Sequence, residues 1–368
     1  MQNLWDGIPA WEGEAPAEPQ PRKMTSFCRS RLGRSLALPI VLLFVQNVTA
    51  GDVVIVRNSK PGQPPVQRQG EIVDLAGNQL MFRGPSGVVE TIPLEQITDW
   101  RTAWSATKEQ ADALYLEKKY AEAATTYLRA REEEQRVWVR RQIMIRLIEC
   151  HAATGNNAAA AEEFLILVSS DPETMAWEIA PLAWRAVDDE NSRARAAQWI
   201  RDTRNPAKQL FGGSWLLAGP QRSEAITVLQ TLAGGTNKRI ATLAVIQLWR
   251  TRIITSPPEE AASWLAGLER LPNETRPLGY FCVGEAFARH DHPEKAALAF
   301  LRIPILYPRT RPLAAEALLA AAAQLEKMDR REQAAGLYRE ILTDHAALPA
   351  AATARQRLEQ LATPAPKP

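Results

Sequence analysis

Residues 289–308 read RHDHPEKAALAFLRIPILYP, and the pattern in this stretch decides the fold. Two histidines flank Asp291, which raises the question of a metal or catalytic site. However, Ala296 is followed four residues later by Phe300, so a small and a large apolar residue share one helix face. This spacing predicts a helix that begins at Pro293. The histidines then fall in the preceding turn, where Asp291 or His292 is expected to cap the helix.

The same spacing recurs from about residue 104 onward. Seven alanines, called the repeat alanines below, stand 37, 36, 29, 36, 35 and 38 residues apart: Ala123, Ala160, Ala196, Ala225, Ala261, Ala296 and Ala334. The residue four positions after each one is large and apolar. A small residue lets the second helix of a hairpin approach the first closely, and the large residue fills the groove beside it. The pattern predicts about seven helical hairpins over residues 103–361.

The middle of the repeat region fits the pattern less well. Trp184 stands twelve residues before its repeat alanine, where it is expected to pack between helices. The interval of 29 residues is too short for a full repeat, and Gly212-Gly213 and Gly234-Gly235 are expected to interrupt helices there. We therefore expect irregular or shortened hairpins between 190 and 240.

The repeat resembles the tetratricopeptide repeat, whose period is near 34 residues. Residues 305–342 and 348–361 are similar to one branch of that family, which includes bacterial envelope proteins: the coordinator of the Tol-Pal system and the outer-membrane assembly lipoproteins. The resemblance implies a right-handed α-solenoid whose first helices line a concave groove for protein partners. In that groove, the residue eleven positions before each repeat alanine is expected to face the partner. The candidates are Asp112, Glu149, Arg185, Arg250 and Glu285, with Ser214 and Ala323 at the equivalent positions.

Residues 51–102 differ from the helical region. Short β-branched runs alternate there with turn signals at Ala76-Gly77-Asn78 and Gly84–Gly87. We expect strands near 52–57, 69–75, 79–83, 88–92 and 97–101, with a tight turn at 93–96. Five short strands suggest a small barrel similar to SH3-like or Sm-like folds. Two roles stay open for it: a packing cap on the helices, or a module that binds peptide, RNA or cell-wall material.

The N-terminal fifty residues have a different character. Residues 1–23 are rich in Pro, Ala and Glu without apolar periodicity, and they are predicted to be a disordered extension. Residues 24–50 contain three arginines, then the apolar run LALPIVLLFV (36–45), then small residues up to Ala50. This is the layout of a secretory signal peptide, and ten apolar residues are too few for a bilayer span of about 20. We expect export to the periplasm or cell envelope without a membrane anchor. Residues 362–368 are predicted to be a disordered tail.

The composition excludes several classes of function. The formal net charge is +2 without a block of like charges, so a nucleic-acid partner is not expected. Three cysteines without a CxxC motif predict neither a zinc ribbon nor a thioredoxin-type centre. The sequence contains no HExxH, GxSxG, Walker or GxGxxG motif. His151 and His292 stand four repeats apart, and a solenoid repeat contacts only its neighbours, so they are not expected to share a metal. We predict no catalytic residue, cofactor or metal.

These features together predict a non-catalytic scaffold or adaptor that binds a protein or peptide partner in the bacterial cell envelope. One alternative is a protein that binds the cell wall or a polysaccharide through the N-terminal strand module. A second and weaker alternative is an enzyme, which would require a metal retained by residues such as His290.

Overall fold

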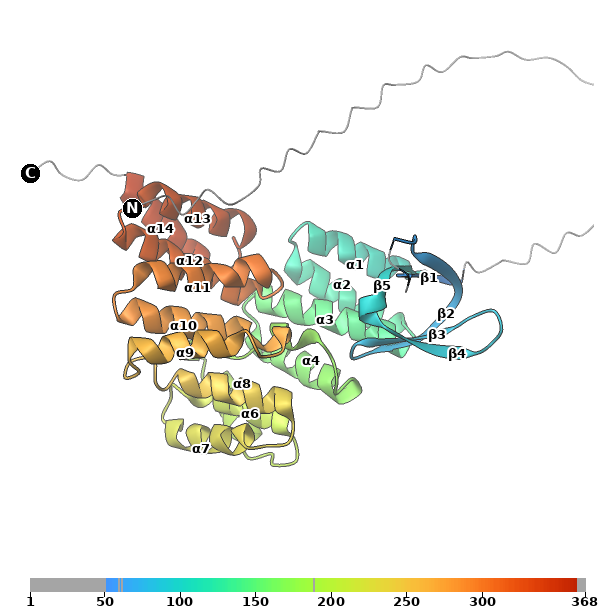
Figure 1. Ribbon diagram of the computed structural model, residues 1–368, viewed down its shortest axis with the longest axis horizontal. Helices are drawn as coiled ribbons and strands as arrows, with labels where there is room; N and C mark the ends of the chain where they lie inside the picture. The colour runs from blue at the N-terminus through green and yellow to red at the C-terminus, as the bar shows by residue number, and fades with distance from the viewer. Residues whose placement is uncertain (1–50, 59, 61, 188, 363–368) are drawn as a thin grey trace, which may run out of the picture. The chain divides into compact units, whose positions relative to one another are not determined.

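The structure is a computed structural model that describes residues 51–58, 60, 62–187 and 189–362. All of these residues belong to one compact unit, Thr49–Pro368. The predicted extension, the signal peptide and residues 363–368 of the predicted tail lie outside the described residues. The described part is mainly helical, with 14 α-helices that follow a small five-stranded antiparallel sheet (Figure 1).

The sheet contains β1 (Asp52–Val56), β2 (Val66–Ala76), β3 (Gln79–Arg83), β4 (Val89–Pro93) and β5 (Ile97–Arg101). Their order is β4-β3-β2-β1-β5, and each neighbouring pair is antiparallel. The five predicted strands are confirmed, although β2 begins earlier than expected. The predicted turn between the last two strands is also confirmed, as the 3₁₀ helix η1 (Leu94–Gln96).

The long strand β2 changes its partner at Gly70. Gly70 lies opposite Asp52 of β1, whereas the next residue, Glu71, lies opposite Arg83 of β3. A Cβ atom at position 70 would lie 2.1 Å from the carbonyl oxygen of Arg83, so a side chain cannot be accommodated there. A glycine is therefore needed where the two halves of the sheet meet.

The sheet shares an apolar core with the first helices. Trp138 at the start of α3 (Val137–Ala153) is 1% exposed and packs among the strand residues. Its indole Nε1 donates a hydrogen bond to the carbonyl oxygen of Ile72 at 3.1 Å. One turn later, Arg141 Nη1 binds Asp74 Oδ1 at 2.8 Å. These contacts attach the sheet to α3.

Every repeat alanine lies in an α-helix. The helices that contain them are α2 (Tyr120–Glu133), α4 (Asn157–Ser170), α5 (Glu190–Trp199), α7 (Arg222–Ala233), α9 (Pro258–Leu268), α11 (Pro293–Leu306) and α13 (Arg331–Asp344). The helices that precede or follow them are α1 (Ala106–Leu116), α3, α6 (Pro206–Leu216), α8 (Lys238–Trp249), α10 (Pro277–Arg289), α12 (Arg311–Lys327) and α14 (Ala350–Ala362). Most successive helices pack against each other.

The predicted close approach of the two helices of a hairpin is confirmed. All seven repeat alanines are fully buried, and the large residue four positions later is buried in six repeats and half-buried at Leu265. On the preceding helix, a Cβ atom at Gly213 would lie 2.9 Å from Leu229. A Cβ atom at Gly284 would lie 2.6 Å from the ring of Phe300. The large residue therefore packs onto the backbone of the helix before it.

Four repeats use the same turn between their two helices. A residue with positive φ stands five positions before the repeat alanine in each: Lys118 at 61°, Gly155 at 76°, Asp291 at 56° and Asp329 at 57°. The next residue returns its N–H to the first helix, as His292 does to the carbonyl oxygen of Phe287 at 3.0 Å. This geometry is that of the Schellman motif, which closes a helix with a left-handed residue.

The His290-Asp291-His292 stretch is thus a turn, as the sequence predicts. Pro293 occupies the first position of α11, and Glu294 lies in its first turn. The expected side-chain cap is wrong, because the N-cap residue His292 makes no side-chain capping hydrogen bond. The left-handed conformation of Asp291 directs the chain into the next helix instead.

The left-handed position gives a direct stability test. We expect Gly155→Ala to lower the free energy of unfolding by about 1–2 kcal/mol, because a Cβ atom is strained at positive φ. Apart from the glycine and its chain neighbours, no atom lies within 4 Å of the added Cβ atom, so the loss would come from the backbone conformation alone. Gly336→Ala is the matched control, since Gly336 is an exposed helical residue that also has open space around it. It should raise the stability by roughly 0.5–1 kcal/mol. Urea denaturation measures the stability of both variants. A change in the same direction in both would contradict the left-handed conformation of Gly155.

The described residues between α4 and α5 contain no α-helix. The chain forms the 3₁₀ helix η2 (Ala176–Ile179) and then runs irregularly through residues 180–187, called the inner segment below. Pro181 has no N–H to donate and disfavours a helical conformation at Ala180, whose φ and ψ are −56° and 127°. The prediction of a complete hairpin is therefore wrong at this point, because the repeat of Ala196 lacks a first helix.

The expectation of shortened hairpins between 190 and 240 is confirmed, since α5, α6 and α7 contain 10, 11 and 12 residues. The expected interruption at Gly212-Gly213 is wrong, because both glycines lie inside α6 and are buried. A Cβ atom at Gly212 would lie 2.6 Å from the carbonyl oxygen of Ala196. These glycines bring α6 close to α5 instead of ending a helix.

Early and late repeats contact each other directly. Helix α12 packs against α3 (Figure 1), and Arg309 Nε binds Glu149 Oε1 at 2.7 Å. Lys118 Nζ binds Asp344 Oδ1 at 2.8 Å, across 226 positions of sequence. The expectation that each repeat contacts only its neighbours is therefore wrong. The array curls so that its two ends share ion pairs.

Candidate binding cavity

A cavity of about 530 Å³ lies where the inner segment runs between the early and late repeats. Its walls include η2, the inner segment, the end of α3, the start of α12, one residue each of α6 and α8, and two residues of α10. Pockets that bind small molecules commonly measure about 300–1,000 Å³. The cavity is thus large enough for a ligand.

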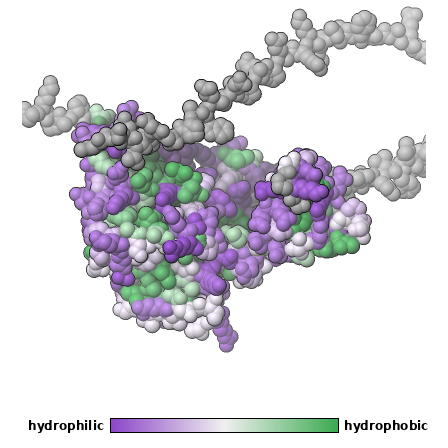
Figure 2. Space-filling view, viewed as in Figure 1, coloured by the Kyte–Doolittle hydropathy of each residue, from purple (hydrophilic) through white to green (hydrophobic). Residues whose placement is uncertain are grey.

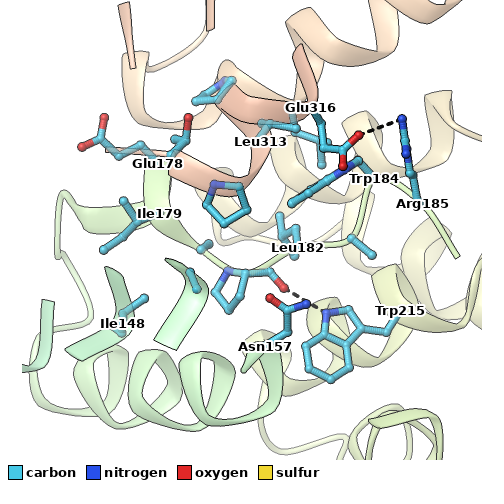
Figure 3. A pocket seen from close by; sticks show the side chains of 18 of the residues that line it. Ile148, Asn157, Glu178, Ile179, Leu182, Trp184, Arg185, Trp215, Leu313 and Glu316 are labelled. Atoms are coloured by element: carbon cyan, nitrogen blue, oxygen red, sulfur yellow. Dashed lines mark hydrogen bonds and ion pairs between the residues drawn. The ribbon is translucent and has the colours of Figure 1, made fainter. Parts of the chain in front are cut away.

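Apolar side chains make up much of the wall. Figure 3 shows side chains from η2, α3, α12 and the inner segment converging on one space. The labelled apolar ones are Ile148, Ile179, Leu182, Trp184, Trp215 and Leu313. Ile179, Leu182 and Leu313 are each at most 7% exposed over the whole residue. These residues are far apart in the sequence, so the wall exists only in the folded chain.

An ion-pair network around the buried Glu149 forms one side of the cavity. The side chain of Glu149 is fully buried, and it accepts hydrogen bonds from Arg309 Nε at 2.7 Å and Arg146 Nη1 at 2.9 Å. Arg309 also donates through Nη1 to Glu178 Oε1 at 3.0 Å. Burial raises the pKa of Glu178, and Arg309 opposes this increase only in part. One arginine thus links two carboxylates from different repeats.

A second ion pair stands on the opposite part of the wall. Arg185 Nη2 lies 2.8 Å from Glu316 Oε2, as the dashed line in Figure 3 marks. The Arg185 side chain is 58% exposed, whereas that of Glu316 is only 14% exposed. Burial raises the pKa of Glu316 and also that of nearby Glu285, and Arg185 lowers both. The largely exposed Arg185 thus pairs with Glu316 and also lies near the partly buried Glu285.

The inner segment is held in place through its backbone. Side chains from α6 and the end of α8 bind it: Ser214, Trp215, Gln247 and Arg250. The N–H of Ala183 donates to Ser214 Oγ at 2.8 Å, and Trp215 Nε1 donates to the carbonyl oxygen of Pro181 at 2.9 Å. Arg250 Nη2 donates to the carbonyl oxygen of Arg185 at 3.2 Å. Burial lowers the pKa of Arg250 to about 10, which still leaves it charged at neutral pH.

The sequence-predicted groove residues do not all meet. Glu149 and Arg185 line the cavity, although Arg185 lies on the inner segment and not on a helix. Arg250 binds the backbone of that segment, and Glu285 lies near Arg185. Asp112 does not line the cavity and instead binds Lys108 Nζ at 2.7 Å and the hydroxyl of Tyr127. Whether these residues contact a partner stays a prediction.

Several wall residues were not among the sequence-predicted candidates. They are Trp177, Glu178, Arg309 and Glu316. For the first two, a signal exists in AWEIAPLAW (176–184), where a proline interrupts an apolar run and so marks a buried, non-helical segment. Arg309 and Glu316 offer no local signal, because their acidic or basic partners lie more than 100 positions away.

The outer surface carries smaller apolar features. Figure 2 shows apolar patches among hydrophilic side chains over the helices and over the sheet. A hollow of about 420 Å³ is lined by residues of α9, α10 and α11, including Leu265, Phe287 and Leu298. Fewer charged groups converge on it than on the cavity.

The histidines do not converge on one site. His290 Nε2 lies 2.6 Å from the carbonyl oxygen of Ser256, so that ring is bound to backbone. Within residues 51–362, as far as they are described, no cluster of three or more His, Cys, Asp or Glu side chains could hold a metal ion. No helix in the described part of the chain is long and apolar enough to cross a membrane.

The arrangement therefore suits binding: an apolar cavity with buried carboxylates, next to a backbone segment that side chains already hold. Comparison of the chain with protein-family models, with curated proteins and with solved structures found no significant match.

Proposed function

We propose that this chain is an exported, non-catalytic adaptor of the bacterial cell envelope that holds a segment of a partner protein in the cavity. The observation that carries the proposal is the inner segment, whose backbone binds Ser214, Trp215, Gln247 and Arg250. The same side-chain chemistry that holds this segment is suited to a second peptide beside it. The cavity leaves about 530 Å³ for such a peptide.

The finer description of the fold belongs to this proposal. The fully buried repeat alanines and the shared left-handed turns support a right-handed solenoid of hairpins similar to tetratricopeptide repeats. The partner change of β2 at Gly70 supports an SH3-like barrel. In such a solenoid, stacked hairpins create an extended concave surface on which a partner can lie.

A second candidate is a cell-wall or polysaccharide-binding protein that uses the sheet. The observation that favours it is a group of exposed apolar side chains on β3, β4 and their connection. Val88 is 67% exposed, Met81 40% and Val89 39%. Apolar side chains on a sheet surface can contact the faces of sugar rings. A separate substitution on this surface therefore tests the second candidate.

Point variants separate the two candidates better than deletions do, because Trp138 and Arg141 connect the sheet to the helices. Ala186 is exposed and lines the cavity, so Ala186→Trp should fill its mouth without disturbing the core. Val88→Glu places a charge on the sheet surface. We expect Ala186→Trp to reduce recovery of crosslinked envelope proteins at least tenfold, and Val88→Glu to leave it unchanged. Quantitative mass spectrometry of the crosslinked material measures both, with circular dichroism as the control for folding.

The reverse result, with partner recovery or peptidoglycan binding lost in Val88→Glu alone, would replace the adaptor proposal with the second candidate. Equal recovery in both variants and the unmodified chain would contradict the adaptor proposal.

A further inference from the structure

We propose that the cavity selects a cationic apolar segment, in which a lysine or arginine side chain is flanked by apolar residues and its cation lies against Glu316. This inference rests on the proposed adaptor function and specifies the chemistry of the partner. It is carried by the geometry around Glu316, by the aromatic and apolar wall beside it, and by an unpartnered donor on the same cavity.

The first step is the charge around Glu316. Its Oε2 atom is buried, and its polar contact among the described residues is the ion pair with Arg185 at 2.8 Å. Arg185 is 58% exposed and also lies near the partly buried carboxyl group of Glu285. A buried carboxylate is costly unless it is fully paired. A second cation at Glu316 would complete the neutralisation of the two acids.

The second step is the shape of the wall around this carboxylate. In Figure 3, Leu313 and Trp184 lie directly beside Glu316, and Leu182 faces the same space. An aromatic face next to a carboxylate is a favourable environment for an ammonium or guanidinium group, because the ring attracts cations. Leu182 and Leu313 offer apolar surface for the alkyl stem and for flanking residues.

The third step is an independent polar group. Trp177 lines the cavity and is 2% exposed, yet its indole N–H has no hydrogen-bond acceptor among the described residues. A buried donor without an acceptor costs free energy, so such groups are normally paired. The Nε1 atom has almost no exposed surface, so a peptide carbonyl group would provide the missing acceptor after the side chain shifts towards the cavity. A peptide with a basic side chain thus satisfies the unpaired donor and the under-neutralised acids together.

The charge pattern disfavours an anionic ligand. The two arginines on the wall, Arg185 and Arg309, already bind Glu316, Glu149 and Glu178. An acidic ligand would have to displace one of these carboxylates and leave it buried without its partner. That cost favours a cationic ligand over an anionic one at this site.

The test uses the full chain and capped pentapeptides of sequence Ala-Leu-Xaa-Leu-Ala, with Xaa as lysine, norleucine or glutamate. Norleucine keeps the alkyl chain and removes the charge. We expect the lysine peptide to bind at least tenfold more tightly than the norleucine peptide in isothermal titration calorimetry, and the glutamate peptide to bind most weakly. Free n-butylamine should bind at least tenfold more weakly than the lysine peptide, because it lacks the carbonyl group and flanking side chains.

Protein variants locate the cation. Glu316→Gln should abolish the preference for lysine and leave the norleucine affinity within about twofold. Glu132→Gln is the matched control, because it removes one exposed carboxylate on α2 and should change no affinity. Trp184→Leu should reduce lysine-peptide binding several-fold, which keeps the inference testable if Glu316→Gln fails to fold.

Equal affinity for lysine and norleucine, tighter binding of glutamate, or no binding of any peptide would each overturn the inference. Butylamine binding as tight as that of the peptide would also overturn it, because the ligand would then be a small amine. The crosslinking comparison of Ala186→Trp and Val88→Glu does not depend on these peptides. The adaptor proposal can therefore survive a failure here, and its own failure would be visible separately.

Discussion

Trp138→Ala is expected to lower the free energy of unfolding by about 3–5 kcal/mol, the range for removing a large buried aromatic side chain. Trp138 is 1% exposed, and its ring lies 5.8 Å from that of Trp104 in an edge-on contact. It also donates to the carbonyl oxygen of Ile72 in β2. Because Trp138 joins the sheet to α3, its removal should destabilise the strands and the helices together. Urea denaturation followed by circular dichroism measures the loss.

Trp138→Phe is the control for this prediction. It keeps an aromatic ring but removes the N–H, so the carbonyl group of Ile72 loses its donor. We expect a smaller loss of about 1–3 kcal/mol. A loss below about 1 kcal/mol in Trp138→Ala, or a sheet that melts separately from the helices in the unmodified chain, would contradict the shared core.

Gly284→Leu is expected to lower the free energy of unfolding by about 1–3 kcal/mol or more, the usual cost of overpacking a buried site. A Cβ atom at this position would lie 2.6 Å from the ring of Phe300, which is itself fully buried. Because the ring is fully buried, we expect α10 and α11 to separate to make room for the added side chain. Thermal and urea denaturation of the variant measure the effect.

Gly267→Leu is the matched control in the neighbouring helix α9. No atom lies within 4 Å of a Cβ atom at Gly267, so the same substitution should be neutral or slightly stabilising there. If both variants lose the same stability, the close approach of Gly284 to Phe300 would not explain the effect at Gly284.

The repeat could be predicted from the sequence because its information is local. Ala296 and Phe300 lie one helical turn apart, and a helix places such residues on the same face whatever lies elsewhere in the chain. The strands were predictable for a similar reason, since turn signals such as Ala76-Gly77-Asn78 separate short apolar runs. The contact between Phe300 and Gly284 was harder to predict, because Gly284 has no side chain that would mark it as a packing position.

The missing helix around Trp184 marks the limit of the repeat pattern. The spacing to Ala196 fits a helix, but Pro181 removes a hydrogen-bond donor and constrains Ala180. The tertiary structure then stabilises the irregular segment through side chains such as Ser214 and Trp215. Those contacts span more than 30 positions, so the register of the repeat gave no indication of them.

The sequence by itself determined the helical repeats, the five strands and the turn at His290–His292, because each depends on residues within one or two turns of chain. The tertiary structure alone decided where the array closes and what the cavity contains. Arg309 meets Glu149 across 160 positions and Glu178 across 131. Pairings at such separations depend on the summed geometry of all intervening helices, and small changes in each packing angle accumulate along the chain. For that reason, the seven repeat alanines could predict a stack of hairpins, but not the buried acids that its closure brings together.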